Sequence, residues 1–236
     1  MKVELKDLGD GRCVQMLEGA SMAEAERLAS SINMVRALGV EIASDHSAVE
    51  ADGRAGLEFT MPPGRPFMEW LGSSMFHWDR MVSLLAHEAH EMHLHTAPEL
   101  DGVKDRIGSR LDRSALPDEL VAKVRAVMKK LPDGDFVCNW NCVPESIIVG
   151  LDGPRLVRWD GLLRGPYLAD VARTVVLLKA SGEDVLADTF EKEYMKICGK
   201  PDDEMDSWLL IIAADRLVDG IESERETLGR IVRKFA

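Results

Sequence analysis

The sequence is short of positive charge and has neither a long apolar run nor a pair of cysteines with CxxC spacing. It contains 29 Lys and Arg against 41 Asp and Glu, a formal net charge of −12 at pH 7. This acidic balance argues against nucleic acid as a partner, because phosphate binding needs a clustered basic face. The longest apolar run, WLLIIAA at residues 208–214, falls well short of the ~18 residues that span a membrane. We therefore expect neither a nucleic-acid nor a membrane partner.

The N-terminus and the cysteines both favour one compartment. The opening residues, MKVELKDLGDG, lack the apolar segment of a secretory signal peptide. The four cysteines, Cys13, Cys138, Cys142 and Cys198, have no CxxC spacing, which suits free thiols in a reducing environment. With 46% hydrophobic and 30% charged residues, the composition is that of a globular protein. We expect a cytoplasmic location.

The N-terminal region predicts a small sheet interrupted by one helix. Residues 9–11 read Gly-Asp-Gly between two short apolar runs, which is a hairpin signal. Ser21, followed three residues later by Glu24, predicts a capping box at the start of a helix. Two further strands are expected at residues 40–44 and 57–61, separated by a turn-rich segment.

The proline-rich residues 62–66 predict a boundary between two lobes, after which the chain is mainly helical. Helices are predicted over residues 67–73, 79–95, 117–130, 167–180, 181–198, 204–220 and 222–235. Three short strand-like runs, at residues 136–138, 147–149 and 156–159, lie between the third and fourth of these helices. The predicted domains are a small α/β N-lobe, residues 1–65, and a helical C-lobe, residues 66–236, with a β-hairpin inserted at about 136–159.

Two stretches carry a family resemblance. Residues 131–138 read LPDGDFVC, and residues 164–174 read RGPYLADVART. They resemble the approach to the catalytic loop, and the helix after the metal-binding strand, of the aminoglycoside phosphotransferase and choline kinase family. The resemblance implies an α+β, protein-kinase-like two-lobed fold. Its N-terminal sheet lobe is expected to be truncated, without the family's first strand and glycine-rich loop.

The resemblance also indicates which residues would carry phosphoryl transfer. The family's catalytic loop reads His-Gly-Asp, four residues, then Asn, where this sequence has Asn139-Trp140-Asn141 and then Ser146. Asn141 thus stands in place of the catalytic Asp, and an amide is too weakly basic to accept a hydroxyl proton. Ser146, a poorer ligand, stands in place of the metal-binding Asn.

Two further positions also lack the residue type that phosphoryl transfer requires in the family. Arg158 stands where the second metal ligand should be an Asp, and its fixed positive charge opposes Mg²⁺. Asp160, two residues later, is a conceivable substitute for that ligand. Gln15 occupies the position of the phosphate-binding Lys. Asn141, Gln15, Ser146 and Arg158 are therefore the candidate site residues, and no metal ligand is predicted among them.

Three functions remain open at this stage. The first is a catalytically inactive, pseudokinase-like protein that binds a small-molecule or anionic ligand, or a protein partner, without a cofactor. The second is an active transferase, an ATP-dependent small-molecule phosphotransferase with an atypical metal site, which alone would need ATP and Mg²⁺. The third is a structural interaction domain whose cleft is filled by its own side chains.

Residues 87–95, HEAHEMHLH, are rich in histidine but do not form the zincin motif H-E-x-x-H. Helical periodicity predicts a solvated helix face with His93 at its edge, and at most adventitious affinity for Ni²⁺ or Zn²⁺. Cys138 and Cys142 flank the expected loop and are predicted to be buried free thiols rather than nucleophiles.

Overall fold

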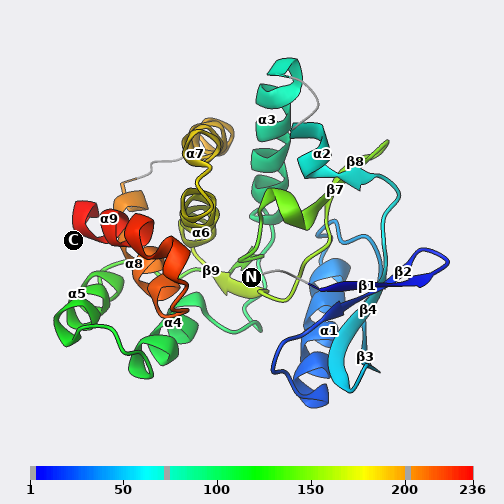
Figure 1. Cartoon of the computed structure of the whole chain (residues 1–236), viewed down its shortest axis with the longest axis horizontal. Helices are drawn as coiled ribbons and strands as arrows, with labels where there is room; N and C mark the ends of the chain where they lie inside the picture. The colour runs from blue at the N-terminus through cyan, green and yellow to red at the C-terminus, as the bar shows by residue number, and fades with distance from the viewer. Residues whose placement is uncertain (1–3, 72–74, 200–202, 236) are drawn as a thin grey trace. The chain divides into compact units, whose positions relative to one another are not determined.

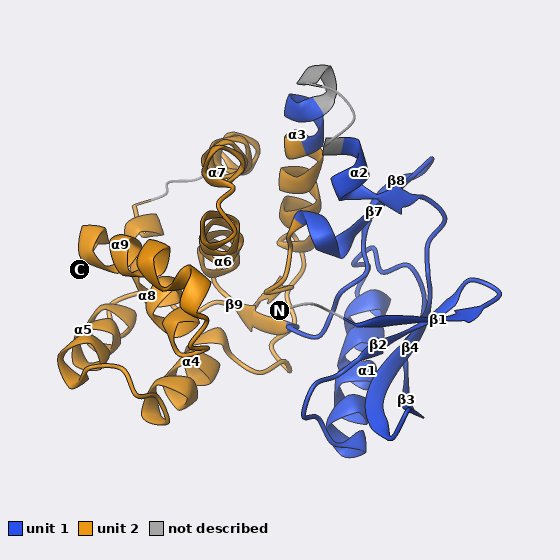
Figure 2. Cartoon of the chain, in the orientation of Figure 1, with its two compact units in different colours: residues 1–81, 144–162 blue, residues 82–143, 163–236 orange. Residues whose placement is uncertain are grey.

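The computed structural model describes residues 4–71, 75–199 and 203–235 (Figure 1). Contacts within the chain define a first unit, residues 1–81 and 144–162, and a second unit, residues 82–143 and 163–236 (Figure 2). This division differs from the predicted lobes, because residues 66–81 and most of the inserted hairpin join the first unit. In the part of the chain that is described, no helix has the length and apolar character needed to cross a bilayer.

The first unit contains an antiparallel sheet in the order β1-β2-β4-β3. Its strands are β1 (Leu5–Gly9), β2 (Arg12–Met16), β3 (Ser47–Ala51) and β4 (Arg54–Thr60). The predicted Gly-Asp-Gly hairpin is confirmed: β1 pairs with β2, and Asp10 in the turn has a φ of +53°. The predicted strand at residues 40–44 is wrong. The backbone there bonds locally instead of to a strand: Ile42 N donates to the Val40 carbonyl at 2.8 Å, and the Ile42 carbonyl accepts from Arg36 Nε at 3.2 Å.

Helix α1 (Met22–Ala37) packs against β3 and β4. The capping box is confirmed: Glu24 N donates to Ser21 Oγ, and Ser21 N donates to the Glu24 carboxylate at 2.8 Å. The buried side of the helix is made largely of small residues, Ala25 and Ala29 with Ile32 and Val35. Small side chains at this spacing let the helix lie close to the sheet.

A second sheet of the first unit explains why the proline-rich segment and the hairpin belong together. It consists of β5 (Arg65–Pro66), β7 (Ile147–Gly150) and β8 (Gly153–Leu156), with α2 (Phe67–Leu71) and the 3₁₀ turn η1 (Pro144–Ser146) beside it. The predicted helix at residues 67–73 ends, within the described residues, at Leu71, and its last two residues lie outside them. The predicted strand at 156–159 is misplaced. Strand β8 begins at Gly153, which pairs with Gly150, and ends at Leu156, which pairs with Ile147, the first residue of β7.

The second unit is built around α6 (Tyr167–Ala180), which packs against α7 (Asp184–Cys198) and α8 (Met205–Leu217). Almost every side chain of α6 from Leu168 to Val176 is buried, and α8 is buried on all sides over most of its length. The remaining elements are α3 (Met75–Met92, shared with the first unit), α4 (Val103–Asp112), α5 (Asp118–Met128), β6 (Phe136–Cys138), β9 (Leu163–Gly165), the 3₁₀ turn η2 (Glu222–Glu224) and α9 (Arg225–Phe235). Strands β6 and β9 pair antiparallel, and Gly165 at the end of β9 lies opposite Phe136, so α6 begins beside the start of β6.

Candidate functional site

The loop after β6 in the second unit holds one of the four candidate site residues, Asn141, and α6 anchors it. Asn139 N and Trp140 N both donate to the Asp170 carboxylate, at 3.1 and 2.7 Å. Trp140 has a φ of +65°, a backbone conformation that bulky residues rarely adopt. The two hydrogen bonds from these backbone amides hold the loop in this conformation, because Asp170 is fixed within a fully packed helix.

A buried hydrogen-bonded network extends from Asp170 to α7. His93 Nε2 lies 3.2 Å from Asp170 Oδ2, and His93 Nδ1 lies 2.7 Å from Tyr194 Oη. Because a carboxylate oxygen only accepts, the tautomer that satisfies both contacts carries its proton on Nε2 and accepts from the Tyr194 hydroxyl at Nδ1. The prediction that His93 lies at the edge of a solvated face is wrong: it is 5% exposed, because α3 ends at Met92 and the turn that follows directs His93 inward.

The side chain of Trp140 is buried over a cation. The guanidinium carbon of Arg173 lies 5.5 Å from the centroid of the Trp140 ring, a cation–π distance. Arg173 Nη1 lies 3.7 Å from Asp215 Oδ2 on α8, and burial lowers the pKa of Arg173 to about 10. Through its contacts with the Trp140 ring and the Asp215 carboxylate, Arg173 on α6 links the loop to α8.

Asn141, the position of the catalytic carboxylate in the resemblance, is half-buried in the same loop. Its backbone amide donates to Asn139 Oδ1 at 3.1 Å, and its carbonyl accepts from Val143 N at 2.8 Å. Cys138 and Cys142, on either side, are free and buried as predicted. Burial raises the pKa of both thiols well above the usual value, so both are protonated and unreactive at neutral pH.

The other three predicted positions, Gln15, Ser146 and Arg158, belong to the first unit. Gln15 on β2 and Ser146 in η1 are 1% and 0% exposed. Gln15 Oε1 and Ser146 Oγ have no hydrogen-bond partner among the described residues. Buried polar atoms without a partner are rare in proteins, and His46 Nε2 is a third such atom among the described residues of the first unit.

Arg158 lies just beyond β8 and directs its guanidinium to Asp160. Arg158 Nε and Nη2 donate to the two oxygens of that carboxylate at 3.3 and 3.2 Å. Both side chains are largely buried, at 10% and 16% exposed. Asp160, which the sequence offered as a substitute metal ligand, is therefore a counter-ion of Arg158.

An apolar cluster joins β2 to the segment before Arg158. Cys13, Phe59 and Val157 are buried against one another, and Met61 and Ile148 pack around them. Cys13 and Gln15 are two residues apart on one strand and so point to the same face of the sheet. Apolar side chains thus pack directly beside Gln15 on that face.

The fold was compared with solved structures. An aminoglycoside-3'-phosphotransferase of type VIII is 17% identical with a TM-score of 0.61, over 92% of this chain and 93% of that one. An ethanolamine kinase from Plasmodium vivax is 10% identical with a TM-score of 0.66, over 98% and 79%. A choline kinase from Streptococcus pneumoniae is 12% identical with a TM-score of 0.62, over 98% and 88%. By sequence, no family model and no curated protein matches this chain.

The chain has the kinase-like fold of these phosphotransferases. The resemblance inferred from residues 131–138 and 164–174 is thereby confirmed for the fold, together with the α+β class. Sequence identities of 10–17% support a shared fold and do not by themselves support a shared function.

Sequence reasoning missed two parts of the loop's support in this kinase-like chain. Asp170 lies within a stretch that carries the resemblance, but the sequence predicts neither its hydrogen bonds to two loop amides nor its contact with His93. Arg173 beneath Trp140 was not foreseen either. An Asp and an Arg within an otherwise apolar helix, ADVARTVVLL, were the available signal, because charged residues at buried positions need partners.

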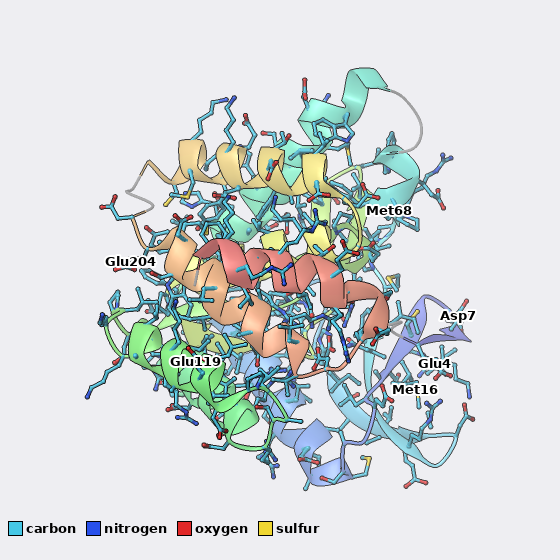
Figure 3. The ribbon with its side chains drawn as sticks, turned by 60° about the vertical axis from the view of Figure 1, so that its left-hand side comes forward. Glu4, Asp7, Met16, Met68, Glu119 and Glu204 are labelled. Atoms are coloured by element: carbon cyan, nitrogen blue, oxygen red, sulfur yellow. The ribbon has the colours of Figure 1, made fainter. Side chains whose placement is uncertain are left out.

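The second unit also contains a cavity of about 270 Å³, between the turn at Pro132 and Asp133 and the start of α8. Phe136 and Tyr167 line it, with ring centroids 5.9 Å apart. Glu204, labelled in Figure 3 beside α8, is one of three carboxylates on its wall. One of the three, Asp133, pairs with Lys104 at 2.9 Å, and the remaining negative charge of Asp203 and Glu204 disfavours the anionic ligand that the sequence left open.

Proposed function

We propose that this chain is a kinase-fold protein that does not transfer phosphate and instead acts by binding a ligand or a protein partner. The observation that carries the proposal is the ion pair of Arg158 with Asp160. A guanidinium occupies the position that the resemblance assigns to a metal-binding carboxylate, and the nearest carboxylate along the chain neutralises it. An acid that serves as an arginine's counter-ion is a weaker ligand for a second cation.

The donor set supports the same proposal. Mg²⁺ requires hard oxygen ligands, with carboxylates prominent among them. The family positions here supply an amide at Asn141, a hydroxyl at Ser146 and a cation at Arg158. Such residues do not fit Mg²⁺.

The loop also lacks a group that accepts a proton. Phosphoryl transfer to a hydroxyl in this fold uses a carboxylate as catalytic base. The Asn141 amide oxygen is too weakly basic for that task at neutral pH. The Cys138 and Cys142 thiols do not replace it, because their raised pKa values keep them protonated.

A second candidate is a structural interaction domain, and the apolar cluster of the first unit favours it. Cys13, Phe59 and Val157 fill space beside Gln15, at a strand that in the resemblance carries the phosphate-binding Lys. Side chains packed in this way would occupy space that a nucleotide needs in a working site. In this case the protein would bind partners through its outer surface only.

Thermal unfolding of the full chain with ligands separates these functions. We expect no stabilisation that depends on both Mg²⁺ and ATP, and no nucleotide hydrolysis. Stabilisation by ATP or inorganic phosphate without metal would indicate an anion-binding protein, and no shift with any of them would favour the structural domain. A metal-dependent shift together with phosphoryl transfer to a small-molecule hydroxyl would overturn the proposal and establish the active phosphotransferase.

A further inference from the structure

The buried network of the second unit brings together three side chains of the types that bind zinc. One ligand atom from each of His93, Cys138 and Asp170 lies within 4.8 Å of the other two. All three residues are buried, at 5%, 0% and 1% exposed. They come from the turn after α3, the end of β6 and the first turn of α6. Among the described residues this is the one such group of three.

We propose that His93, Cys138 and Asp170 form a buried site for a divalent transition metal, with Zn²⁺ as the favoured ion. Nitrogen, thiolate and carboxylate ligands together suit Zn²⁺, whereas Mg²⁺ and Ca²⁺ require oxygen ligands. His93 Nε2 and Asp170 Oδ2 are 3.2 Å apart. That separation matches the edge of a tetrahedron with metal–ligand bonds of about 2 Å, which is about 3.3 Å.

The charges of this group also favour a divalent ion. Zn²⁺ with one thiolate and one carboxylate has no net charge, so the assembly is compatible with full burial. Binding would release one proton, from the Cys138 thiol. His93 would remain neutral: its proton would move from Nε2 to Nδ1, and Nδ1 would then donate to the Tyr194 hydroxyl oxygen.

The surroundings already orient the ligands as an outer shell does. Tyr194 Oη is 2.7 Å from His93 Nδ1, the nitrogen that faces away from the group. The Asn139 and Trp140 amides fix the Asp170 carboxylate. Partners of this kind set the ring orientation of ligating histidines and hold ligating carboxylates in place. Three protein ligands leave the fourth position of the tetrahedron to a water molecule.

The proposal does not depend on the proposed function, because its ligands are not the four candidate site residues. It differs equally from the surface affinity expected of the histidine-rich helix. A surface site would involve exposed residues such as His87 and would bind metal ions in the folded protein without unfolding. The buried site would fill during folding, because its ligands are closed to solvent.

The experiment measures the metal content of the untagged full chain, refolded with Zn²⁺ and then dialysed. We expect about one zinc ion per chain. Refolding with Co²⁺ should give a thiolate-to-cobalt charge-transfer band. That band should disappear in Cys138→Ser and persist in Cys142→Ser, a matched control because Cys142 is equally buried but lies outside the group. His87→Gln should leave the band unchanged.

Tyr194→Phe tests the outer shell by removing only a hydroxyl. Apparent zinc affinity should fall by about 10- to 100-fold while the charge-transfer band keeps its position. A refolded chain without stoichiometric zinc would overturn the proposal, and this measurement decides even where a variant fails to fold. A cobalt spectrum without a thiolate band, or with one that persists in Cys138→Ser, would overturn it as well.

Discussion

Asn141 is the residue at which a single substitution tests the proposed loss of phosphoryl transfer. Asn141→Asp restores the carboxylate of the catalytic loop but leaves Ser146 and Arg158 in place. We expect no transfer from ATP to small-molecule hydroxyls above the level of the unsubstituted chain, because position 158 still lacks a metal-binding carboxylate and Asp160 remains the counter-ion of Arg158. Product formation followed with labelled ATP measures this, and robust transfer by the single variant would refute the role given to Arg158.

His46 predicts a pH dependence of stability. It is 4% exposed, stacks on Phe59 with ring centroids 5.0 Å apart, and lies 3.1 Å from the Ser44 carbonyl oxygen through Nδ1. Burial lowers its pKa to about 4, although the Ser44 carbonyl and Asp45 oppose this effect. In the unfolded chain His46 is therefore protonated as the pH falls through about 6.5, whereas in the folded chain it stays neutral until about pH 4. Stability is complete above about pH 6.5 and is lost as the pH falls toward 4.

We expect this group to reduce the free energy of unfolding by about 2 kcal/mol between pH 7.5 and pH 4.5. Urea unfolding at the two pH values measures the change. In His46→Gln the pH dependence should be smaller by this amount, whereas His87→Gln, an exposed control, should retain it. Equal pH dependence in His46→Gln and the unsubstituted chain would contradict the assignment.

At the residue scale, the sequence predicted the chemistry of single positions better than their surroundings. That Asn141 is an amide and Arg158 a cation follows from the residue types alone. The pairing of Arg158 with Asp160, the inward position of His93 and the cation beneath Trp140 do not. Each depends on where a strand or helix ends, and a shift of one or two residues at such an end changes which side chains meet.

At the scale of the element, the start of α1 offers a direct measurement. Ser21→Ala removes the side-chain acceptor for Glu24 N and half of the capping box. We expect a loss of about 1 kcal/mol in the free energy of unfolding. Ser30→Ala is the matched control: it lies exposed within the same helix, where Ala is at least as favourable as Ser. Equal effects of the two substitutions in urea unfolding would show that the cap contributes nothing.

Elements with strong local signals were predicted well, and those set by distant contacts were not. The helix at residues 167–180 and the strand at 136–138 match α6 and β6. Helix α4 was missed, because its sequence VKDRIGSRLD is mostly polar and shows only three buried positions, Val103, Ile107 and Leu111. Strand β5 was missed because only its partner β7, far along the chain, defines it.

The charge of the whole molecule predicts its colloidal behaviour. The net charge of −12 at pH 7 should keep copies of the chain apart, whereas near the isoelectric point of about 5.0 this repulsion disappears. Light scattering should therefore show net repulsion at pH 7.5 and strongest self-association near pH 5. Circular dichroism at each pH separates this effect from the acid unfolding expected from His46. A minimum of solubility far from pH 5 would show that local patches outweigh net charge.

The chain crosses from one unit to the other three times, after residues 81, 143 and 162. No continuous gene fragment therefore encodes either unit. A fragment that stops at residue 81 would contain β5 but not its pairing partner β7. A fragment that begins at residue 82 would include the hairpin, which belongs to the first unit. Isolating the first unit requires a spliced coding sequence that joins residues 1–81 to 144–162 through a designed linker.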